Sequence, residues 1–276
     1  MKLRLLLGLG AVLALGVVGS TARAAAPGAF TRPGAFAWAP GYTCSGGAIP
    51  GGTYTSLTVA GNCFFGGDVT VNGNVTVADG ALLNDHAFSP LATHVVITGN
   101  VRVGKGAVLG LGTYNPAAVH DTTVYGNIVA NQPLSLYLSF ATVHGNVVSN
   151  GGGSGPNGAF RNFPTKDNTI HGNLVVQGWN GGWIGVIRNT VGGNVIFSHN
   201  ASVVVETPPG CDPELGQCTG SAPGTDSDSS EVQTNWISGN LICQDNTPAA
   251  QVNALDGGLP NVVGGKGIGE CAGLTG

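Results

Sequence analysis

The chain has 276 residues, of which 9% are charged and 48 are glycine, and its formal net charge is −4. This composition is too apolar for a disordered chain, and the glycines lack the regular period of collagen. The small negative charge provides no basic stripe for nucleic acid, so we expect no nucleic-acid partner. A chain of this length can bury one sizeable core.

The first 24 residues have the features of an export signal. Lys2 and Arg4 precede the apolar run LLLGLGAVLALGVVG, and ARA at positions 22–24 matches a small-x-small cleavage site. The run is short for a membrane span, and no second long apolar run follows it. We therefore predict a signal peptide at 1–24 and a secreted mature protein without a membrane span. An uncleaved N-terminal anchor is the alternative.

Cysteines are the next feature along the chain, and an exported chain with six of them is expected to form disulfides. No CxxC pair is present, which makes a metal site the weaker interpretation. Several connectivities are open, but the order along the chain suggests three pairs. These are Cys44–Cys63, Cys211–Cys218 and Cys243–Cys271.

The central part of the chain repeats a Gly-Asn motif between aliphatic pairs, as in TVYGNIVA, TVHGNVVS and NTIHGNLVVQ. The spacings fit a unit of about 20 residues with insertions, and such a period indicates a repeat architecture. The longest spacing fits one unit plus an inserted loop at 206–231. The first spacing is too short, so Asn62 lies on another face or the register there is unsettled. The asparagines are Asn62, Asn74, Asn100, Asn127, Asn146, Asn173, Asn194 and Asn240.

Two columns at fixed offsets from these asparagines are wholly aliphatic from Asn74 onward. Since alternate side chains of a strand point to opposite faces, both columns should point inward, with Gly-Asn as a bend between them. Stacked asparagines can hydrogen-bond from coil to coil. Glycine interrupts every candidate helix, and β-branched residues dominate. The columns are Val71, Ile97, Val124, Val143, Ile170, Val191 and Ile237, and Val75, Val101, Ile128, Val147, Leu174, Val195 and Leu241.

These patterns predict an all-β fold, a single-stranded parallel β-helix of about seven coils. Each coil buries its aliphatic columns only by stacking on the next coil. We expect the repeats to span 62–246, with the inserted loop at 206–231. The open edges at both ends need covers. We predict an N-terminal cap at 25–61 and a C-terminal cap at 247–276.

The aliphatic columns and the asparagine ladder resemble the right-handed parallel β-helix class that includes pectate lyases and many secreted surface proteins. This resemblance implies that a long polysaccharide can lie along an outward face. The runs GNVTVADGALL at 73–83 and GNVRVGKGAVL at 99–109 are also similar to bactofilins, which polymerise end to end. The second resemblance implies self-association. Bactofilins are cytosolic as a rule, whereas this chain has a signal peptide and cysteines.

The outward columns of the same alignment contain the candidate ligand-binding residues. Coils about 4.8 Å apart should stack one ring column, with a threonine column beside it and two tryptophans in a nearby segment. Aromatic rings and hydroxyls are suited to sugar recognition. The alternative is that these are ordinary surface residues of a solenoid without a binding role, because threonine is favoured on any exposed strand. The candidates are Tyr125, His144 and His171, Thr123, Thr142 and Thr169, and Trp179 and Trp183.

Catalysis is the second hypothesis for the same face. Asp121 and Asp167 should lie two coils, or about 9.6 Å, apart, with Arg188 next to Asp167. However, Phe140 comes between the two carboxylates, and no acid cluster surrounds Asp167. The polygalacturonase signature is absent. We expect a non-catalytic protein with a structural or carbohydrate-contacting role at the cell surface or outside the cell. A polysaccharide lyase or glycoside hydrolase is the alternative.

Metal binding is supported by few residues. Asp226, Asp228 and Glu231 in DSDSSE offer carboxylates for calcium, but they lack the spacing of an EF-hand loop, so a solvated acidic loop is expected. His144 and His171 provide two imidazoles for a shared cation, and a third ligand is not evident. We therefore predict no cofactor, with calcium as the one open alternative.

Overall fold

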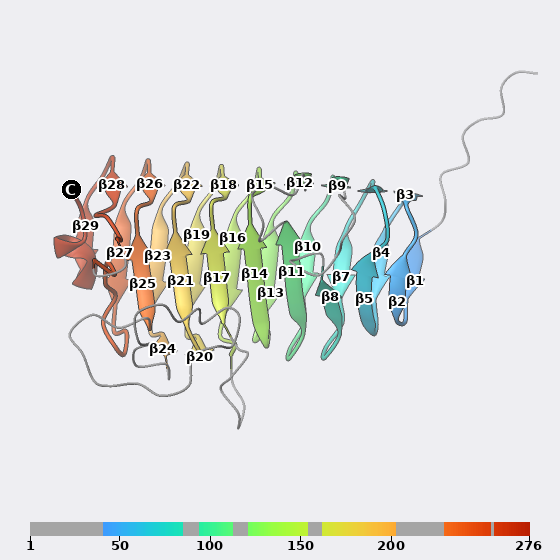
Figure 1. Ribbon diagram of the computed structural model, residues 1–276, viewed down its shortest axis with the longest axis horizontal. Coiled ribbons are helices and arrows are strands. Elements are labelled where there is room, and N and C mark those ends of the chain that lie inside the picture. The colour runs from blue at the N-terminus through green and yellow to red at the C-terminus, as the bar shows by residue number, and fades with distance from the viewer. Residues whose placement is uncertain (1–40, 85–93, 113–120, 154–161, 203–228, 255–256) are drawn as a thin grey trace, which may run out of the picture. The chain divides into compact units, whose positions relative to one another are not determined.

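The structure is a computed structural model that describes residues 41–84, 94–112, 121–153, 162–202, 229–254 and 257–276. The predicted signal peptide, the Cys211–Cys218 pair, and Asp226 and Asp228 lie outside these residues. The described chain winds through three parallel sheets, so the prediction of an all-β parallel β-helix is confirmed (Figure 1). No helix in the described part of the chain is long and apolar enough to span a membrane.

Three long parallel sheets, named A, B and C, form the stack, and each of the first eight coils contributes one strand to sheet B, then one to sheet C, then one to sheet A. Coil 1 is formed by β1, β2 and β3, and the numbering of the coils follows the chain (Figure 1). Sheet B contains β1 (Tyr42–Cys44), β4 (Leu57–Val59), β7 (Val75–Val77), β10 (Val101–Val103), β13 (Ile128–Asn131), β16 (Val147–Asn150), β19 (Leu174–Gln177), β23 (Val195–Ser198), β27 (Leu241–Gln244) and β29 (Gly267–Gly269).

Sheets C and A complete the coils, and a small pair of strands extends coils 7 and 8. Sheet C contains β2 (Gly47–Ile49), β5 (Asn62–Phe65), β8 (Leu82–Asn84), β11 (Val108–Gly112), β14 (Ser135–Ser139), β17 (Phe163–Lys166), β21 (Ile184–Ile187) and β25 (Ser230–Gln233). Sheet A contains β3 (Gly52–Tyr54), β6 (Val69–Val71), β9 (His94–Ile97), β12 (Asp121–Val124), β15 (Ala141–Val143), β18 (Thr169–Ile170), β22 (Thr190–Val191), β26 (Trp236–Ile237) and β28 (Val262–Val263). The small pair is β20 (Asn180–Gly181) and β24 (Ala201–Ser202).

The predicted aliphatic columns form the core. Val143 is the Cα partner of Ile170, and Ile170 is the partner of Val191 on the next coil. All three side chains are fully buried, as is Leu174 in the second column. Because successive coils of the repeat present the same columns at the same offsets, burial of one coil requires the next, and the apolar interior is continuous along the stack.

The predicted asparagine ladder occupies the corner between sheets A and B. The side-chain oxygen of Asn127 accepts hydrogen bonds from the backbone N–H of Asn146, at 2.8 Å, and from its side-chain amide, at 3.0 Å. Asn146 accepts the same pair of bonds from Asn173. The side chains thus replace ladder bonds that the backbone cannot make at the bend, which confirms the predicted coil-to-coil hydrogen bonding.

The glycine before each asparagine stacks on the glycine of the preceding coil, so we expect Gly145→Ala to destabilise the fold by about 1–3 kcal/mol. A methyl group at Gly145 would overlap the carbonyl oxygen of Gly126 and lie 2.7 Å from the side-chain oxygen of Asn127. Chemical denaturation would measure the change. Gly273→Ala is the control, because nothing lies within 4 Å of the added methyl group there. Equal stability of the two variants would contradict the packing argument.

The N-terminal cap predicted at 25–61 is wrong over its described part. Strands β1 to β4 lie there and pair in the same sheets, with Tyr42 opposite Leu57 and Gly52 opposite Val69. The stack therefore begins earlier and is longer than the predicted seven coils. The first coils lack Gly-Asn at the corner between sheets A and B, so an alignment on that motif does not detect them. Asn62 lies in β5 of sheet C, on another face than Asn74, which explains the short spacing.

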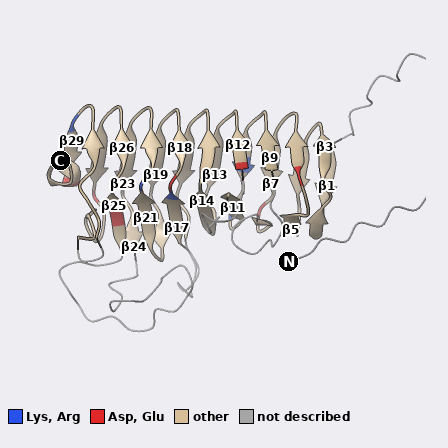
Figure 2. Cartoon of the chain, turned by 45° about the horizontal axis from the view of Figure 1, so that its top comes forward, with Lys and Arg blue, Asp and Glu red and all other residues tan. Residues whose placement is uncertain are grey.

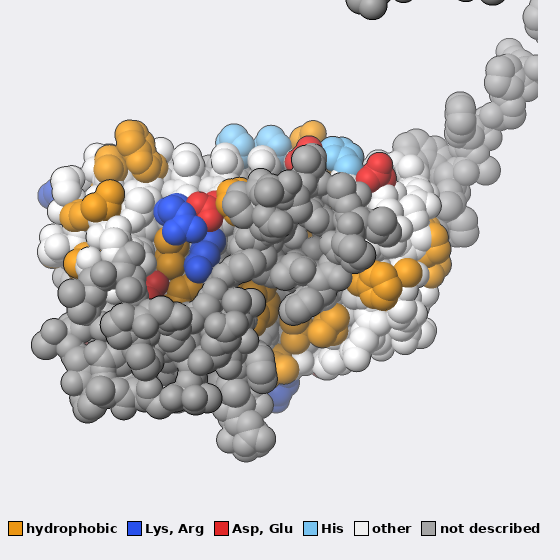
Figure 3. Space-filling model, in the orientation of Figure 1, with side chains coloured by type: hydrophobic (Ala, Val, Ile, Leu, Met, Phe, Trp, Pro, Cys, Tyr) orange, Lys and Arg blue, Asp and Glu red, His pale blue; other side chains and the backbone are white. Residues whose placement is uncertain are grey.

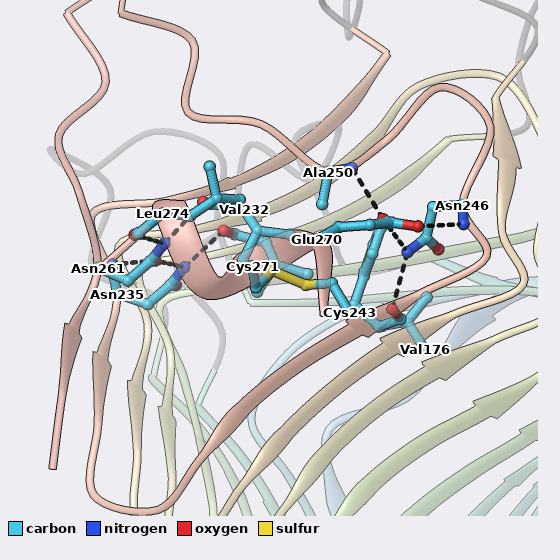
Figure 4. Close-up of a disulfide and its surroundings, with 12 residues drawn as sticks. Val176, Val232, Asn235, Cys243, Asn246, Ala250, Asn261, Glu270, Cys271 and Leu274 are labelled. Atoms are coloured by element: carbon cyan, nitrogen blue, oxygen red, sulfur yellow. Dashed lines mark hydrogen bonds between the residues drawn. A yellow bond between two sulfur atoms is a disulfide. The ribbon is translucent and has the colours of Figure 1, made fainter. Parts of the chain in front are cut away.

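The C-terminal segment 247–276 is partly coil and partly cap. Strands β28 and β29 extend sheets A and B, and the 3₁₀ helix Glu270–Gly273 follows. Cys271 in that helix is bonded to Cys243 in β27, as suggested from the order of the cysteines (Figure 4). The disulfide is fully buried and ties the final segment to the last strands.

The N-terminal end is held by the other suggested disulfide, Cys44–Cys63, which joins β1 of coil 1 to β5 of coil 2. Both cysteines are buried. Tyr54 also lies at this end and donates a hydrogen bond to the carbonyl oxygen of Pro50 at 2.7 Å. Burial, and to a smaller extent the nearby Tyr42, raises the pKa of the Tyr54 hydroxyl. Both described disulfides therefore lie at the ends of the stack.

Two further ladders were not predicted. One lies between sheets C and A, and its asparagines are buried: Asn168, Asn189, Asn235 and Asn261. The other lies between sheets B and C, where Asn200 donates to Asn246 and Asn246 donates to both carboxylate oxygens of Glu270 (Figure 4). A carboxylate fits this final position because the preceding asparagine offers two donors.

Candidate functional site

The outward side of sheet A carries the predicted ring column. Tyr125, His144 and His171 each follow the last residue of a sheet A strand, at the start of the corner to sheet B. The backbone N–H of His144 donates to the carbonyl of Val124 at 2.8 Å, and that of His171 donates to Val143 at 2.9 Å. The parallel register therefore places the three side chains at equivalent positions on coils 4, 5 and 6.

The three rings form a regular stack. The ring centroids of Tyr125 and His144 are 4.6 Å apart with an interplanar angle of 4°, and those of His144 and His171 are 4.7 Å apart with an angle of 5°. These separations match the spacing of neighbouring strands, about 4.8 Å. The rings therefore stack along the axis of the β-helix, and their planes lie across it. All three side chains are exposed, and Figure 3 shows histidines gathered along the upper edge, over sheet A.

A threonine column runs beside the rings, as predicted. Thr123 is the Cα partner of Thr142, and Thr142 is the partner of Thr169. The first two side chains are partly buried and Thr169 is exposed. The structure thus brings three rings and a row of hydroxyls onto one face. That these residues bind a ligand stays a prediction.

The prediction that Trp179 and Trp183 contribute to this face is wrong, because both are buried. Trp179 packs edge-on against Phe163, with ring centroids 5.2 Å apart, and it fills the space above Gly152. Trp183 lies under Lys166, whose ammonium nitrogen is 4.6 Å from the ring centroid. Residues of neighbouring coils therefore bury both tryptophans.

Trp236 is an exposed aromatic residue in the threonine column that was not predicted as a site residue. It lies in β26, opposite Thr190 of β22 and Val262 of β28. Its side chain is 65% exposed, which is unusual for so large an apolar group. Its place at the end of a column of hydroxyl residues was the signal available in the sequence.

The candidate catalytic residues do not converge. Asp121 lies beside His94, whose Nδ1 is 3.3 Å from a carboxylate oxygen. Asp167 accepts two hydrogen bonds of 2.7 Å from Arg188 on the adjacent coil, as the predicted adjacency of these two residues requires. The coil that carries Phe140 lies between Asp121 and Asp167. Each carboxylate therefore has its own basic partner, and the structure does not pair the two acids across a substrate.

Charged groups are sparse on the described strands, where Figure 2 shows them scattered among uncharged residues. Glu231, predicted to lie in a solvated acidic loop, is instead buried in β25, which corrects that expectation. Its two oxygens accept hydrogen bonds from Gln233 and Asn253 at 3.0 Å each. These amides occupy the carboxylate, so Glu231 offers no open ligand for calcium.

The histidine stack has the wrong geometry for a shared metal ion. Zinc binds imidazole nitrogen at about 2.0–2.1 Å, so two ligands of one ion hold their nitrogens at most about 4.2 Å apart. The rings of His144 and His171 are parallel and their centroids are 4.7 Å apart, so they stack face to face instead of converging on one point. Among the described residues, no group of three or more His, Cys, Asp or Glu side chains could hold a metal.

Comparison of the chain with protein-family models, curated proteins and solved structures found no match.

Proposed function

We propose that this chain is an exported, non-catalytic β-helix that contacts carbohydrate through the outward face of sheet A. The observation that carries the proposal is the exposed stack of Tyr125, His144 and His171 beside the threonine column. The exposed edges of the rings and the regularly spaced threonine hydroxyls can exchange hydrogen bonds with sugar hydroxyls, and the ring face at an end of the stack can pack against the C–H face of a sugar.

Other features support a rigid extracellular scaffold. The described disulfides are typical of oxidising compartments, and they lie at the ends of the stack. The resemblance to right-handed β-helices of the pectate lyase class supports carbohydrate as the partner. The resemblance to bactofilins supports end-to-end association as a secondary role. The separate engagement of Asp121 and Asp167 supports binding without catalysis.

The proposal predicts that His144→Ala/His171→Ala leaves folding intact and weakens glycan binding about 5- to 100-fold. A hydrogen bond from a ring edge, or a contact of an end ring face, contributes about 0.5–1.5 kcal/mol, and two rings are removed. Both side chains are exposed, so their loss creates no cavity. A glycan array would identify the ligand, and isothermal titration calorimetry would measure its dissociation constant for wild type and variant.

The matched control is His94→Ala/His199→Ala, which removes two exposed imidazoles outside the stack. This control should bind like wild type. Unchanged affinity of the His144/His171 variant, or no glycan bound by the wild-type protein, would refute the proposed function. Release assays on polysaccharides should show no cleavage, and cleavage would favour the lyase or hydrolase alternative.

A further inference from the structure

The ring stack ends at coil 7, where the equivalent position is a glycine. Ile170 is the Cα partner of Val191, so the residue that follows His171 in the column is Gly192. The backbone N–H of Gly192 continues the ladder by donating to Ile170 at 2.8 Å. One rung of the stack therefore has a backbone but no side chain, and the ring face of His171 toward coil 7 is not covered by a residue of this column.

The backbone geometry requires this rung to be empty. A Cβ atom at Gly192 would overlap the carbonyl oxygen of His171 and lie 3.1 Å from its carbonyl carbon. No other amino acid fits there without a shift of the backbone. At the opposite end of the stack, coil 3 places the exposed side chain of Thr98 next to Tyr125. The two ends of the stack are therefore different, and the end at His171 is open.

Coil 8 provides the far side of this opening. Val191 is the partner of Ile237, so Ser238 follows Gly192 in the ring column. In the neighbouring threonine column Thr190 is followed by Trp236. The side chains of Ser238, Thr190 and Trp236 are all exposed. His171 and the plane of Ser238 are two strand spacings, or about 9.6 Å, apart, which is room for one ring at the spacing of the stack.

We propose that a single sugar ring fills this rung, with one face on the imidazole of His171, the other face toward the hydroxyl of Ser238, and its edge toward the hydroxyl of Thr190. The inference rests on the proposed function and names its ligand. A ring in this position lies across the rod axis, because the rings of the stack do. In a polysaccharide that runs along the β-helix, the ring plane of each internal sugar lies along the β-helix axis. Such a sugar cannot stack on His171. The ligand is therefore a terminal or branch sugar.

Trp236 extends this binding position. It lies on coil 8, the coil after that of Gly192, in the column next to the ring stack. Its side chain is 65% exposed. The sugar unit that joins the bound terminal ring to its chain can pack on this indole. His171 and Trp236 thus form the two aromatic contacts, whereas Tyr125 at the far end of the stack touches neither sugar.

The test compares His171→Ala, Trp236→Ala and Tyr125→Ala in binding to a glycan found on the array. All three replace exposed side chains, and circular dichroism would check their folding. We expect at least fivefold weaker binding for His171→Ala and for Trp236→Ala, and a smaller loss for Tyr125→Ala, whose ring contacts other parts of the glycan. Phe64→Ala, which removes an exposed ring from sheet C, is the control and should change binding less than twofold. Removing the terminal and branch sugars from the glycan should abolish binding, and the released monosaccharide should compete at millimolar concentration.

The proposed sugar position at Gly192 is overturned if Tyr125→Ala weakens binding as much as His171→Ala, or if the trimmed glycan still binds. In either case carbohydrate binding by the whole face stands. If none of the three variants changes binding, the inference and the proposed function both fail.

Discussion

Replacing Asn235 by alanine should lower the free energy of unfolding by about 3–5 kcal/mol, and we expect this to be among the largest effects of a single substitution. Asn235 is fully buried between sheets C and A. Its amide donates to the carbonyl of Val186 at 2.8 Å and to the side chain of Asn261 at 2.8 Å. Its oxygen accepts two bonds from Asn189. Alanine would leave several buried donors and acceptors without partners.

Asn74→Ala is the matched control, because Asn74 is exposed and heads the ladder at the corner between sheets A and B. Water can replace its bonds to Asn100, so the loss should stay below about 1.5 kcal/mol. Chemical denaturation would measure both variants. A smaller loss for Asn235→Ala than for Asn74→Ala would show that buried ladder bonds do not stabilise the stack.

Removing the Cys243–Cys271 disulfide by a double alanine substitution should cost about 3.5 kcal/mol and promote self-association. The bond closes a sequence separation of 28 residues, and loop-closure entropy predicts a stabilisation of this size. It also ties the 3₁₀ helix Glu270–Gly273 to the last strands. Without that link β29 can separate from β27, and the edge of β27 that this exposes becomes available for pairing with another chain.

Thermal unfolding and size-exclusion chromatography would measure these two effects. A double alanine variant of Cys44 and Cys63 is the comparison, since it removes a disulfide of similar loop length from the other end. That variant should lose similar stability. An unchanged melting temperature in both variants would contradict the view that the disulfides clamp the ends.

The position of the ring stack could be predicted from the sequence because it follows from local rules. Each of Tyr125, His144 and His171 stands two residues before an asparagine of the repeat, and strand alternation assigns that offset to one face. The same rules predicted the adjacency of Asp167 and Arg188. Gly192 stands two residues before Asn194 and so belongs to the ring column by the same rules, but the effect of its missing side chain depends on the ring planes, which only the structure shows.

The prediction for Trp179 and Trp183 was wrong for a physical reason. Both lie in segments of variable length between the repeated motifs, so no fixed offset assigns them to a face. Their burial depends on residues of other coils, such as Gly152 beneath Trp179 and Lys166 above Trp183. Contacts between coils are not encoded within either coil alone.

The repeated offsets in the sequence by themselves determined the parallel β-helix, its aliphatic interior and the outward columns, because a strand alternates its faces with a period of two and stacked coils keep register. Only the tertiary structure decided where the stack begins, which tryptophans are buried, and that the two acids have separate basic partners. These properties depend on how segments distant in sequence pack against one another, and their energies arise from contacts that no local pattern contains.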